Sequence, residues 1–290
     1  MLAVTAWDAA LILSKIGVVL GLLAAAGCAG ALQAVHDGTR AGHLRLLGYG
    51  LAGAVLGFHG SLFLVLVQLG QINDAGLMGM FDLDLALLLR GTPVWESAAF
   101  RSVGFGLSAL VTLASIRALK AQRSAPPKAF YRIAQLGQLL ALGLVLVGFT
   151  LLGHVSVLSW LLRCALAVHV GAVACWIGML LPLRWSCERS AIDRLSGQMR
   201  AFGRAGVVLV LALGLSGTLL LLTLSSPSEL LTTAYGRLLS LKLLLFLALV
   251  TLAALNKLRF VPQMSRGDVL PLRRSIGWEI VVAALVLLLT

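Results

Sequence analysis

The sequence has little charge and little proline. Only 12% of its 290 residues are Asp, Glu, Lys or Arg, and it contains 7 prolines, whereas 60% of the residues are hydrophobic. A typical soluble domain has about 25% charged residues, so too few polar side chains are available here to cover a water-soluble fold. The composition therefore excludes a soluble globular protein. It indicates an all-α, polytopic membrane protein with a single transmembrane domain, residues 1–290.

Acidic residues are scarce. The 11 Asp and Glu residues are outnumbered by 23 Lys and Arg residues, which gives a formal net charge of +12. A basic excess is also typical of nucleic-acid-binding proteins, but these basic residues fall mainly in short loops between apolar segments. Membrane orientation explains that distribution better. We therefore expect membrane lipid as a partner and no nucleic acid.

Several motifs of other protein classes are missing. The chain has no GxxxxGK[ST] loop, so any transport would be passive or coupled to an ion, and we predict that the protein is not an enzyme. Its 4 cysteines lie in or just past apolar runs, which argues against a disulfide framework. The N-terminus lacks a basic segment and a small-residue cleavage site. We therefore expect a retained first helix rather than a removed signal peptide.

Apolar runs are abundant, and the mean hydropathy is +1.00. About 20 predominantly apolar residues are needed to cross the hydrocarbon core of a bilayer. Eight segments are candidates for such spans, and the last of them is short. They are residues 9–34, 45–69, 98–118, 133–153, 158–182, 204–224, 237–256 and 275–290.

The loop charges predict an orientation. The loops after the third, fifth and seventh segments are rich in Lys and Arg, over residues 117–132, 184–204 and 257–274. The intervening loops are acidic or nearly uncharged. Basic loops stay in the cytoplasm, so both termini are predicted to face outward.

A weak internal repeat accompanies this topology. Residues 88–101 and 229–242 share a leucine, a threonine and a basic residue at a constant offset, and each stretch precedes or opens an outward-starting helix. The matched pairs are Leu89 with Leu230, Thr92 with Thr233, and Arg101 with Lys242. The pattern predicts two parallel four-helix halves, residues 1–153 and 154–290, an arrangement known in transporters.

Three histidines lie within or at the mouth of the predicted spans. His59 and His169 are near the bilayer middle, and His154 is at the outer end of the fourth segment. Intramembrane ionisable residues usually serve a pathway, a cofactor or a structural pair. Imidazole is a common ligand of copper and zinc and also ligates haem iron, but a histidine that only bonds a carbonyl is the alternative.

Sulfur-containing side chains provide a second set of candidate ligands. Cys175 and Met179 are four residues apart and share a helix face, and both are soft ligands that suit Cu(I). Met78 and Met80 alternate with carboxylates in "GLMGMFDLDL" and could capture a metal ion at the outer face. The alternatives are that the first pair is apolar filling and that the second belongs to an interfacial loop.

Charged side chains inside the spans are the last candidates. Four cations fall in the outer third of alternate helices: Lys15, Arg101, Arg163 and Lys242. They could hold lipid phosphate, pair with Asp8 or Glu96, or bind an anionic group such as a haem propionate, unless their stems carry the charges to the surface. Glu279, near the inner end of the last segment, has the basic loops as its expected partners.

Four stretches of the second half together resemble a known family. They are "GHVSVLSWLLRCALAVHVGAVACWIGMLLPL", "FGRAGVVLVLALGLSGTLL", "TAYGRLLSLKLLLFLALVTLAALNKLRFVP" and "RRSIGWE", which contain a Gly-His, a His before a Trp-x-Gly, a Tyr-Gly-Arg and a Ser-Ile-x-x-Glu in that order. Over about residues 148–285 the chain is similar to the copper-resistance D family of bacterial inner-membrane proteins. The matching positions are His154, His169, Trp176, Gly178, Tyr235, Gly236, Lys242 and Glu279.

The resemblance implies eight helices in the bacterial inner membrane, periplasmic termini, and movement of copper from the periplasm to the cytoplasm. It also implies a periplasmic copper-binding partner of the copper-resistance C family. Our leading hypothesis is therefore a copper permease or copper-handling protein that passes a copper ion along the histidine and sulfur ligands. The rivals are an electron carrier that binds haem b through the histidines, and an assembly factor that binds no metal.

Overall fold

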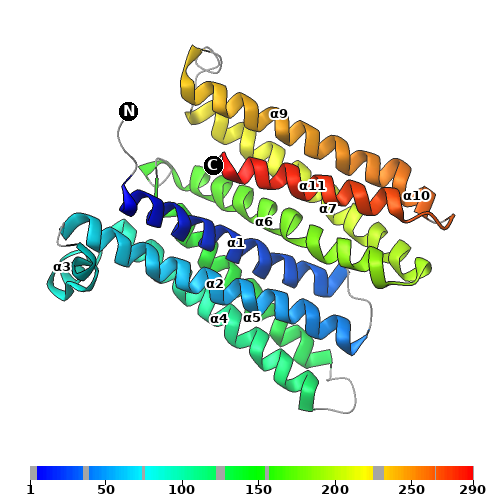
Figure 1. Ribbon diagram of the computed structural model, residues 1–290, viewed down its shortest axis with the longest axis horizontal. Helices are drawn as coiled ribbons and strands as arrows, with labels where there is room; N and C mark the ends of the chain where they lie inside the picture. The colour runs from blue at the N-terminus through cyan, green and yellow to red at the C-terminus, as the bar shows by residue number, and fades with distance from the viewer. Residues whose placement is uncertain are drawn as a thin grey trace. The chain divides into compact units, whose positions relative to one another are not determined.

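The fold was established from a computed structural model, which describes residues 5–34, 39–73, 76–121, 128–153, 157–224, 232–264 and 266–289 (Figure 1). His154 lies outside these ranges. Within the described part of the chain the regular elements are helices, and no strand is present. The all-α prediction is confirmed.

Eight long helices cover the eight predicted apolar segments. They are α1 (Ala6–Ala34), α2 (Arg40–Asn73), α4 (Pro93–Ala121), α5 (Lys128–Thr150), α6 (Trp160–Arg189), α7 (Ile192–Leu224), α9 (Ala234–Leu255) and α11 (Leu270–Leu288). Most extend beyond the predicted span, because polar residues at the ends of a helix continue it into the interface. The short elements are η1 (Gly76–Phe81), α3 (Leu83–Leu88), η3 (Asn256–Phe260) and α10 (Val261–Met264).

Seven of the long helices are long and apolar enough to cross a membrane, counted over the described residues. The eighth, α11, has 19 residues, but Arg273, Arg274 and Glu279 interrupt its apolar character. In the described part of the chain, each of the eight predicted spans therefore corresponds to a long helix. Seven of these helices meet the criterion for a span, and α11 is less apolar than they are. The chain is a multi-pass membrane protein.

Large apolar side chains on the helix surfaces face outward. Leu110 is 67% exposed, Leu215 is 74% exposed and Leu244 is 64% exposed. In water such surfaces would drive aggregation, whereas lipid tails solvate them. The exposed leucines therefore agree with a bilayer around the helices.

The chain forms two compact units. The first comprises Met1–Ala29 and Leu47–Ala167, and the second comprises Gly30–Leu46 and Val168–Thr290. Helices α1, α2 and α6 thus contribute residues to both units. This division differs from the predicted boundary after residue 153, because the ends of α1 and α2 pack with the later helices. The internal repeat stays a prediction.

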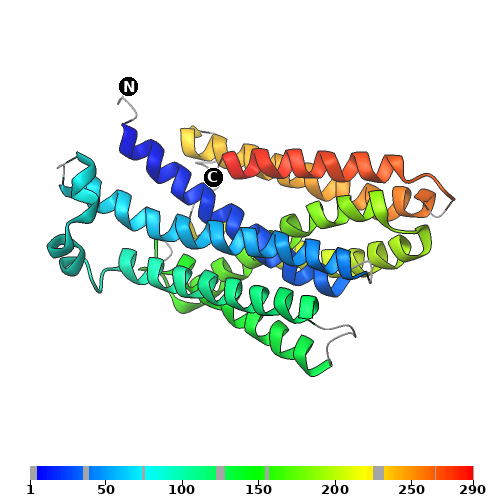
Figure 2. The same ribbon diagram turned by 60° about the horizontal axis from the view of Figure 1, so that its bottom comes forward.

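Small residues hold α1 against α2 in the first unit, where the two helices lie side by side in both views (Figures 1 and 2). A Cβ atom on Gly21 would lie 2.5 Å from the Cα of Gly57 and 2.7 Å from the carbonyl oxygen of Gly53. Such close backbone approach is the usual way in which helices associate in lipid. Lipid solvates apolar side chains about as well as the protein interior does, so their burial contributes little to association.

Polar contacts join α4 to α5 in the same unit. The Ser97 hydroxyl donates to the Gly148 carbonyl at 2.6 Å. Gln138 accepts a hydrogen bond from the Ser108 hydroxyl at 2.8 Å and donates to Thr112 Oγ1 at 2.7 Å. These bonds satisfy side chains that would otherwise be unpaired in hydrocarbon, so they fix the register of the two helices.

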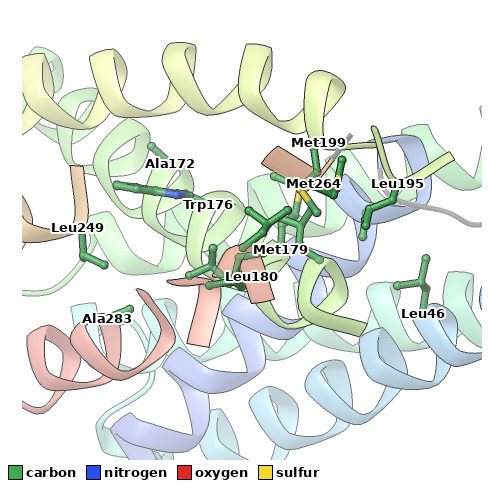
Figure 3. Close-up of a cluster of buried hydrophobic side chains, with 14 of the residues drawn as sticks. Leu46, Ala172, Trp176, Met179, Leu180, Leu195, Met199, Leu249, Met264 and Ala283 are labelled. Carbon is green, nitrogen blue, oxygen red and sulfur yellow. The ribbon is translucent and has the colours of Figure 1, made fainter. Parts of the chain in front are cut away.

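The second unit has a single large apolar core. Side chains of α6, α7, α9, α10 and α11 meet there, and Leu180, Leu183, Leu195 and Leu272 are at most 1% exposed. Helix α11 packs against α9, and the two lie side by side in both views (Figures 1 and 2). Figure 3 shows part of this core, including Trp176 and three methionines.

The α1–α2 contact leads to a stability prediction. Gly21→Ala places a methyl group against backbone atoms of α2 that cannot move aside, so we expect a destabilisation of about 1–3 kcal/mol. Gly48→Ala is the control, because a Cβ at position 48 on α2 meets no atom within 4 Å. Thermal unfolding in detergent measures both variants. Equal midpoints for Gly21→Ala and Gly48→Ala would contradict the close packing.

Candidate functional site

His169 lies on α6 where this helix meets α7 in the second unit. A Cβ atom on Gly217 would lie 3.1 Å from Cε1 of the ring and 3.3 Å from Nδ1. The glycine therefore leaves the space that the imidazole occupies. A larger residue at position 217 would displace the ring, because close-packed interiors have no room to absorb it.

The Ser216 hydroxyl determines which nitrogen of His169 carries the hydrogen. Ser216 Oγ lies 3.3 Å from His169 Nδ1 and donates its single hydrogen to the Ala212 carbonyl at 2.6 Å. The hydroxyl oxygen is then left to accept, which favours the tautomer with the hydrogen on Nδ1 and the lone pair on Nε2. A neutral imidazole with one nitrogen anchored in this way is the form in which histidine binds a metal ion.

Farther along α6, the core contains Trp176 and Met179. Trp176 is 2% exposed and Met179 is 3% exposed. The Met179 sulfur lies against α1, since a Cβ atom on Gly30 would be 2.7 Å from Sδ. Cys175 is a half-buried thiol that packs against the same core. Helix α6 therefore carries an imidazole followed by soft sulfur atoms along its length.

Two more methionines lie in this core, and the sequence reasoning did not single them out. Met199 of α7 is 6% exposed and Met264 of α10 is 0% exposed. Figure 3 labels Met179, Met199 and Met264 among the side chains of this one apolar core. We call these three residues the methionine cluster. No sequence spacing reveals it, because its members lie on three different helices.

The histidines of the first half are placed differently. His59 lies on an exposed face of α2, where Nδ1 bonds the Val55 carbonyl of its own helix at 2.8 Å. Its ring also meets Phe58 edge-on, with 5.7 Å between the ring centroids. His59 belongs to the first unit and His169 to the second. The placement of His154 is not described.

The predicted outer capture loop does not present its residues together. Met78 is 79% exposed, whereas Met80 is 6% exposed and lies against Gly70. The carboxylate of Asp82 accepts from the Leu85 amide at 2.9 Å and from Asn73 Nδ2 at 2.6 Å, so it caps helix α3. The alternation of sulfur and carboxylate in the sequence therefore results from a 3-10 helix followed by a capped turn.

The four intramembrane cations have different surroundings. Lys15 is exposed on α1, and Arg163 and Lys242 are half-buried. Arg101 is 5% exposed, so its charged end lies inside the first unit rather than at the surface. Its Nε donates to the Ser97 carbonyl at 3.1 Å, and its guanidinium lies 5.5 Å from the centre of the Phe149 ring. Arg101 therefore reinforces the α4–α5 contact.

Glu279 is also placed differently from the expectation. The side chain is 1% exposed inside the second unit, and its Oε1 accepts a hydrogen bond from Asn256 Nδ2. The basic loops were its expected partners, but the ion pair found among the described residues joins Arg273 to Glu188 at 2.7 Å. Glu279 is therefore held by a neutral amide at the junction of α9 and η3.

No cluster of three or more His, Cys, Asp or Glu side chains capable of holding a metal ion exists within the described ranges. A hard, tightly chelated site is thus not built from these residues. The arrangement along α6 is instead one imidazole followed by thiol and thioether sulfur. The thiol and thioether ligands are soft and favour Cu(I) over hard cations, and imidazole also binds copper.

Part of the second unit is similar to a known protein family. Residues 196–290 match the family model described as copper resistance protein D. The resemblance inferred from the sequence motifs is confirmed for this part of the chain, which contains Ser216, Gly217 and Glu279 as well as two members of the methionine cluster.

The chain is also similar to a bacterial membrane protein. It is 32% identical over 106 residues to inner membrane protein YebZ of Escherichia coli (strain K12), which covers 35% of this chain and 36% of that protein. The chain therefore matches about a third of the length of this relative. No solved structure matches the chain significantly.

The contact between Ser216 and His169 leads to a spectroscopic prediction. In ¹⁵N spectra of histidine-labelled protein at neutral pH, we expect His169 to carry its hydrogen on Nδ1, and Ser216→Ala to shift the ring toward a mixture of tautomers. His169→Gln assigns the signals. Ser102→Ala, in the first unit, is the control. Identical His169 signals in wild type and Ser216→Ala would show that the hydroxyl does not set the tautomer.

Proposed function

We propose that this chain handles copper in a bacterial inner membrane and moves it from the outer to the inner side. The observation that carries the proposal is the contact between Nδ1 of His169 and Ser216, an arrangement that leaves Nε2 to ligate when Nδ1 carries the hydrogen. The match of residues 196–290 to the copper resistance protein D model supports copper as the metal. The name of the Escherichia coli relative supports the inner membrane.

The order of ligands along α6 suggests a path. A Cu(I) ion entering the second unit would meet His169 in the first half of α6, then Cys175, and then Met179 with the rest of the methionine cluster. The ion would first exchange the imidazole nitrogen for the thiol sulfur, and then the thiol sulfur for thioether sulfur. Conduction requires such weak, successive sites, because a single tight site would retain the ion.

The oxidation state follows from the ligands. Thioether and thiol sulfur are soft donors that stabilise Cu(I), whereas Cu(II) prefers nitrogen and oxygen in tetragonal arrangements. The methionine cluster contains only thioethers, and it lies in a core of aliphatic and aromatic side chains. We therefore propose Cu(I) as the ion that passes the inner part of the path.

Delivery by a partner is part of the proposal. Residues 76–88 of the outer loop, which the structure describes, form no assembled ligand set, since Met80 is buried and Asp82 caps α3. Capture of a dilute ion from solution needs several converging ligands, which this loop does not supply. A periplasmic copper-binding protein of the copper-resistance C family would remove that requirement.

The central test is copper accumulation in cells. We expect His169→Ala to lower copper accumulation several-fold relative to the wild-type protein expressed at the same level. His59→Ala is the matched control, because His59 bonds its own helix on an exposed face, and we expect accumulation close to wild type. Unchanged accumulation in His169→Ala would remove this residue from the path.

The optical spectrum of the purified protein distinguishes the rival functions. Copper handling predicts a preparation without a Soret band. A Soret band that disappears in His169→Ala would instead support a haem b electron carrier. If the wild type shows no Soret band and a variant lacking all three candidate histidines accumulates copper normally, an assembly factor would be favoured.

A further inference from the structure

Glu279 is an acidic side chain almost wholly removed from solvent in the second unit. It is 1% exposed on α11, and Asn256 is the residue whose side chain bonds it. Isolated buried carboxylates are costly, so a carboxylate retained in such a place is normally matched by a cation, a metal ion or a proton.

The groups around Glu279 include several cations, but none forms an ion pair with it in the described part of the molecule. On α6, Arg184 lies against Gly277, with Nη1 3.1 Å from the Cβ position, and Glu188 is paired with Arg273 of α11. The packed elements and the loop beside α11 carry other charged groups. They are Lys257 and Arg259 on η3, Asp268 and Arg274 beside α11, Asp193, Arg194, Arg200 and Arg204 on α7, and Arg237 and Lys242 on α9; α10 has no titratable side chain.

Two buried polar atoms near Glu279 lack a hydrogen-bond partner. They are Oδ1 of Asn256 and Oγ of Ser275. Ser275 is four residues before Glu279, so the two side chains lie on the same face of α11, one turn apart. Buried polar atoms are nearly always bonded, so two unpartnered atoms beside a buried carboxyl indicate a group that changes its hydrogen bonding.

A π-helical turn begins at Asn256. Element η3 (Asn256–Phe260) follows α9 directly, and the amide of Val261 bonds the Asn256 carbonyl five residues back. Single π turns inside helices cost stability and occur frequently at functional sites. Here the turn lies where the end of α9 passes α11, at the residue that bonds Glu279.

A groove lies beside this place, next to Ser275. Its volume is about 500 Å³, and it is lined by Leu252, Leu255, Phe260, Ser275 and Trp278, with Asp268 and Arg274 also contributing. Asp268 belongs to the loop after η3 and α10, which the charge pattern places on the cytoplasmic side. Ser275 is shared by the groove and by the face of α11 that carries Glu279, so it offers a polar step between the two.

We propose that Glu279, Asn256 and Ser275 form a buried proton-binding site that is loaded and emptied through this groove. In the charged state, the carboxylate accepts from Asn256 Nδ2 and from the Ser275 hydroxyl. On protonation, a proton taken from cytoplasmic water forms an O–H bond on the carboxyl, and the new O–H donates to Asn256 Oδ1. Amide and hydroxyl side chains can serve both states because each both donates and accepts.

Proton binding at this site would couple copper movement to a second ion. Such coupling is one of the options for a sequence that has no nucleotide-binding motif. Copper movement in one direction could be linked to protonation of Glu279, since both processes take place in the second unit. This link rests on the proposed copper function. The binding of a proton at Glu279 does not, and the two are tested separately.

Infrared difference spectroscopy tests the proton site on the full chain in detergent, without copper. Between acidic and alkaline buffer we expect the carbonyl stretch of a protonated, buried carboxylic acid, which Glu279→Gln removes. Glu188→Gln is the matched control, because this residue lies in a partly exposed ion pair, and it should leave the band unchanged. A band unaffected by Glu279→Gln, or no band in the wild type, would overturn the proposal.

Ser275→Ala keeps the test meaningful if Glu279→Gln fails to fold. This variant removes only the unpartnered hydroxyl, and we expect it to shift the pH at which the band appears. A thermal melt of each variant confirms folding. A band at the same frequency and the same pH in Ser275→Ala would contradict the role of the hydroxyl.

Vesicles containing the full chain test the coupling. We expect an imposed pH gradient to change the rate of Cu(I) uptake in the wild type and to have no effect in Glu279→Gln, while uptake without a gradient is retained. An equal gradient effect in both would overturn the coupling. No uptake by any variant would count against the copper function, whereas the infrared band would still decide the proton site.

Discussion

A polar side chain within a bilayer must find its partner inside the protein, and this constraint determines the structure of the molecule more than any single apolar contact. Lipid solvates leucine as well as the protein interior does, so helix association depends on close backbone contact and on internal hydrogen bonds. Gly21 against Gly57 illustrates the first, and the bonds of Gln138 across α4 and α5 illustrate the second. His169 and Glu279 obey the same rule, and in each case the partner is a small neutral group.

The neutral partners matter for function. A histidine held by Ser216 keeps a lone pair on Nε2, and a glutamate held by Asn256 keeps the option of a second state. Stronger partners, such as a carboxylate for His169 or an arginine for Glu279, would fix one charge state. Arg101, in contrast, is held by the Ser97 carbonyl and the Phe149 ring in the first unit, where it strengthens a helix contact.

The helices could be predicted from the sequence, because span length and composition are local properties. All eight apolar segments are helical, and the family resemblance is confirmed over residues 196–290. Only part of the candidate site could be predicted from the sequence. His169, Cys175 and Met179 lie on one helix, so their order along it could be predicted, and Cys175 and Met179 also share a face. Met199, Met264 and Asn256 come from other helices, and only tertiary packing places them beside α6 or α11.

The copper path combines one imidazole with sulfur, and X-ray absorption spectroscopy of the purified protein loaded with Cu(I) examines this combination directly. The account predicts sulfur scatterers around copper together with nitrogen, and loss of the nitrogen in His169→Ala while sulfur remains. A copper environment of oxygen and nitrogen alone, unchanged by His169→Ala, would contradict it.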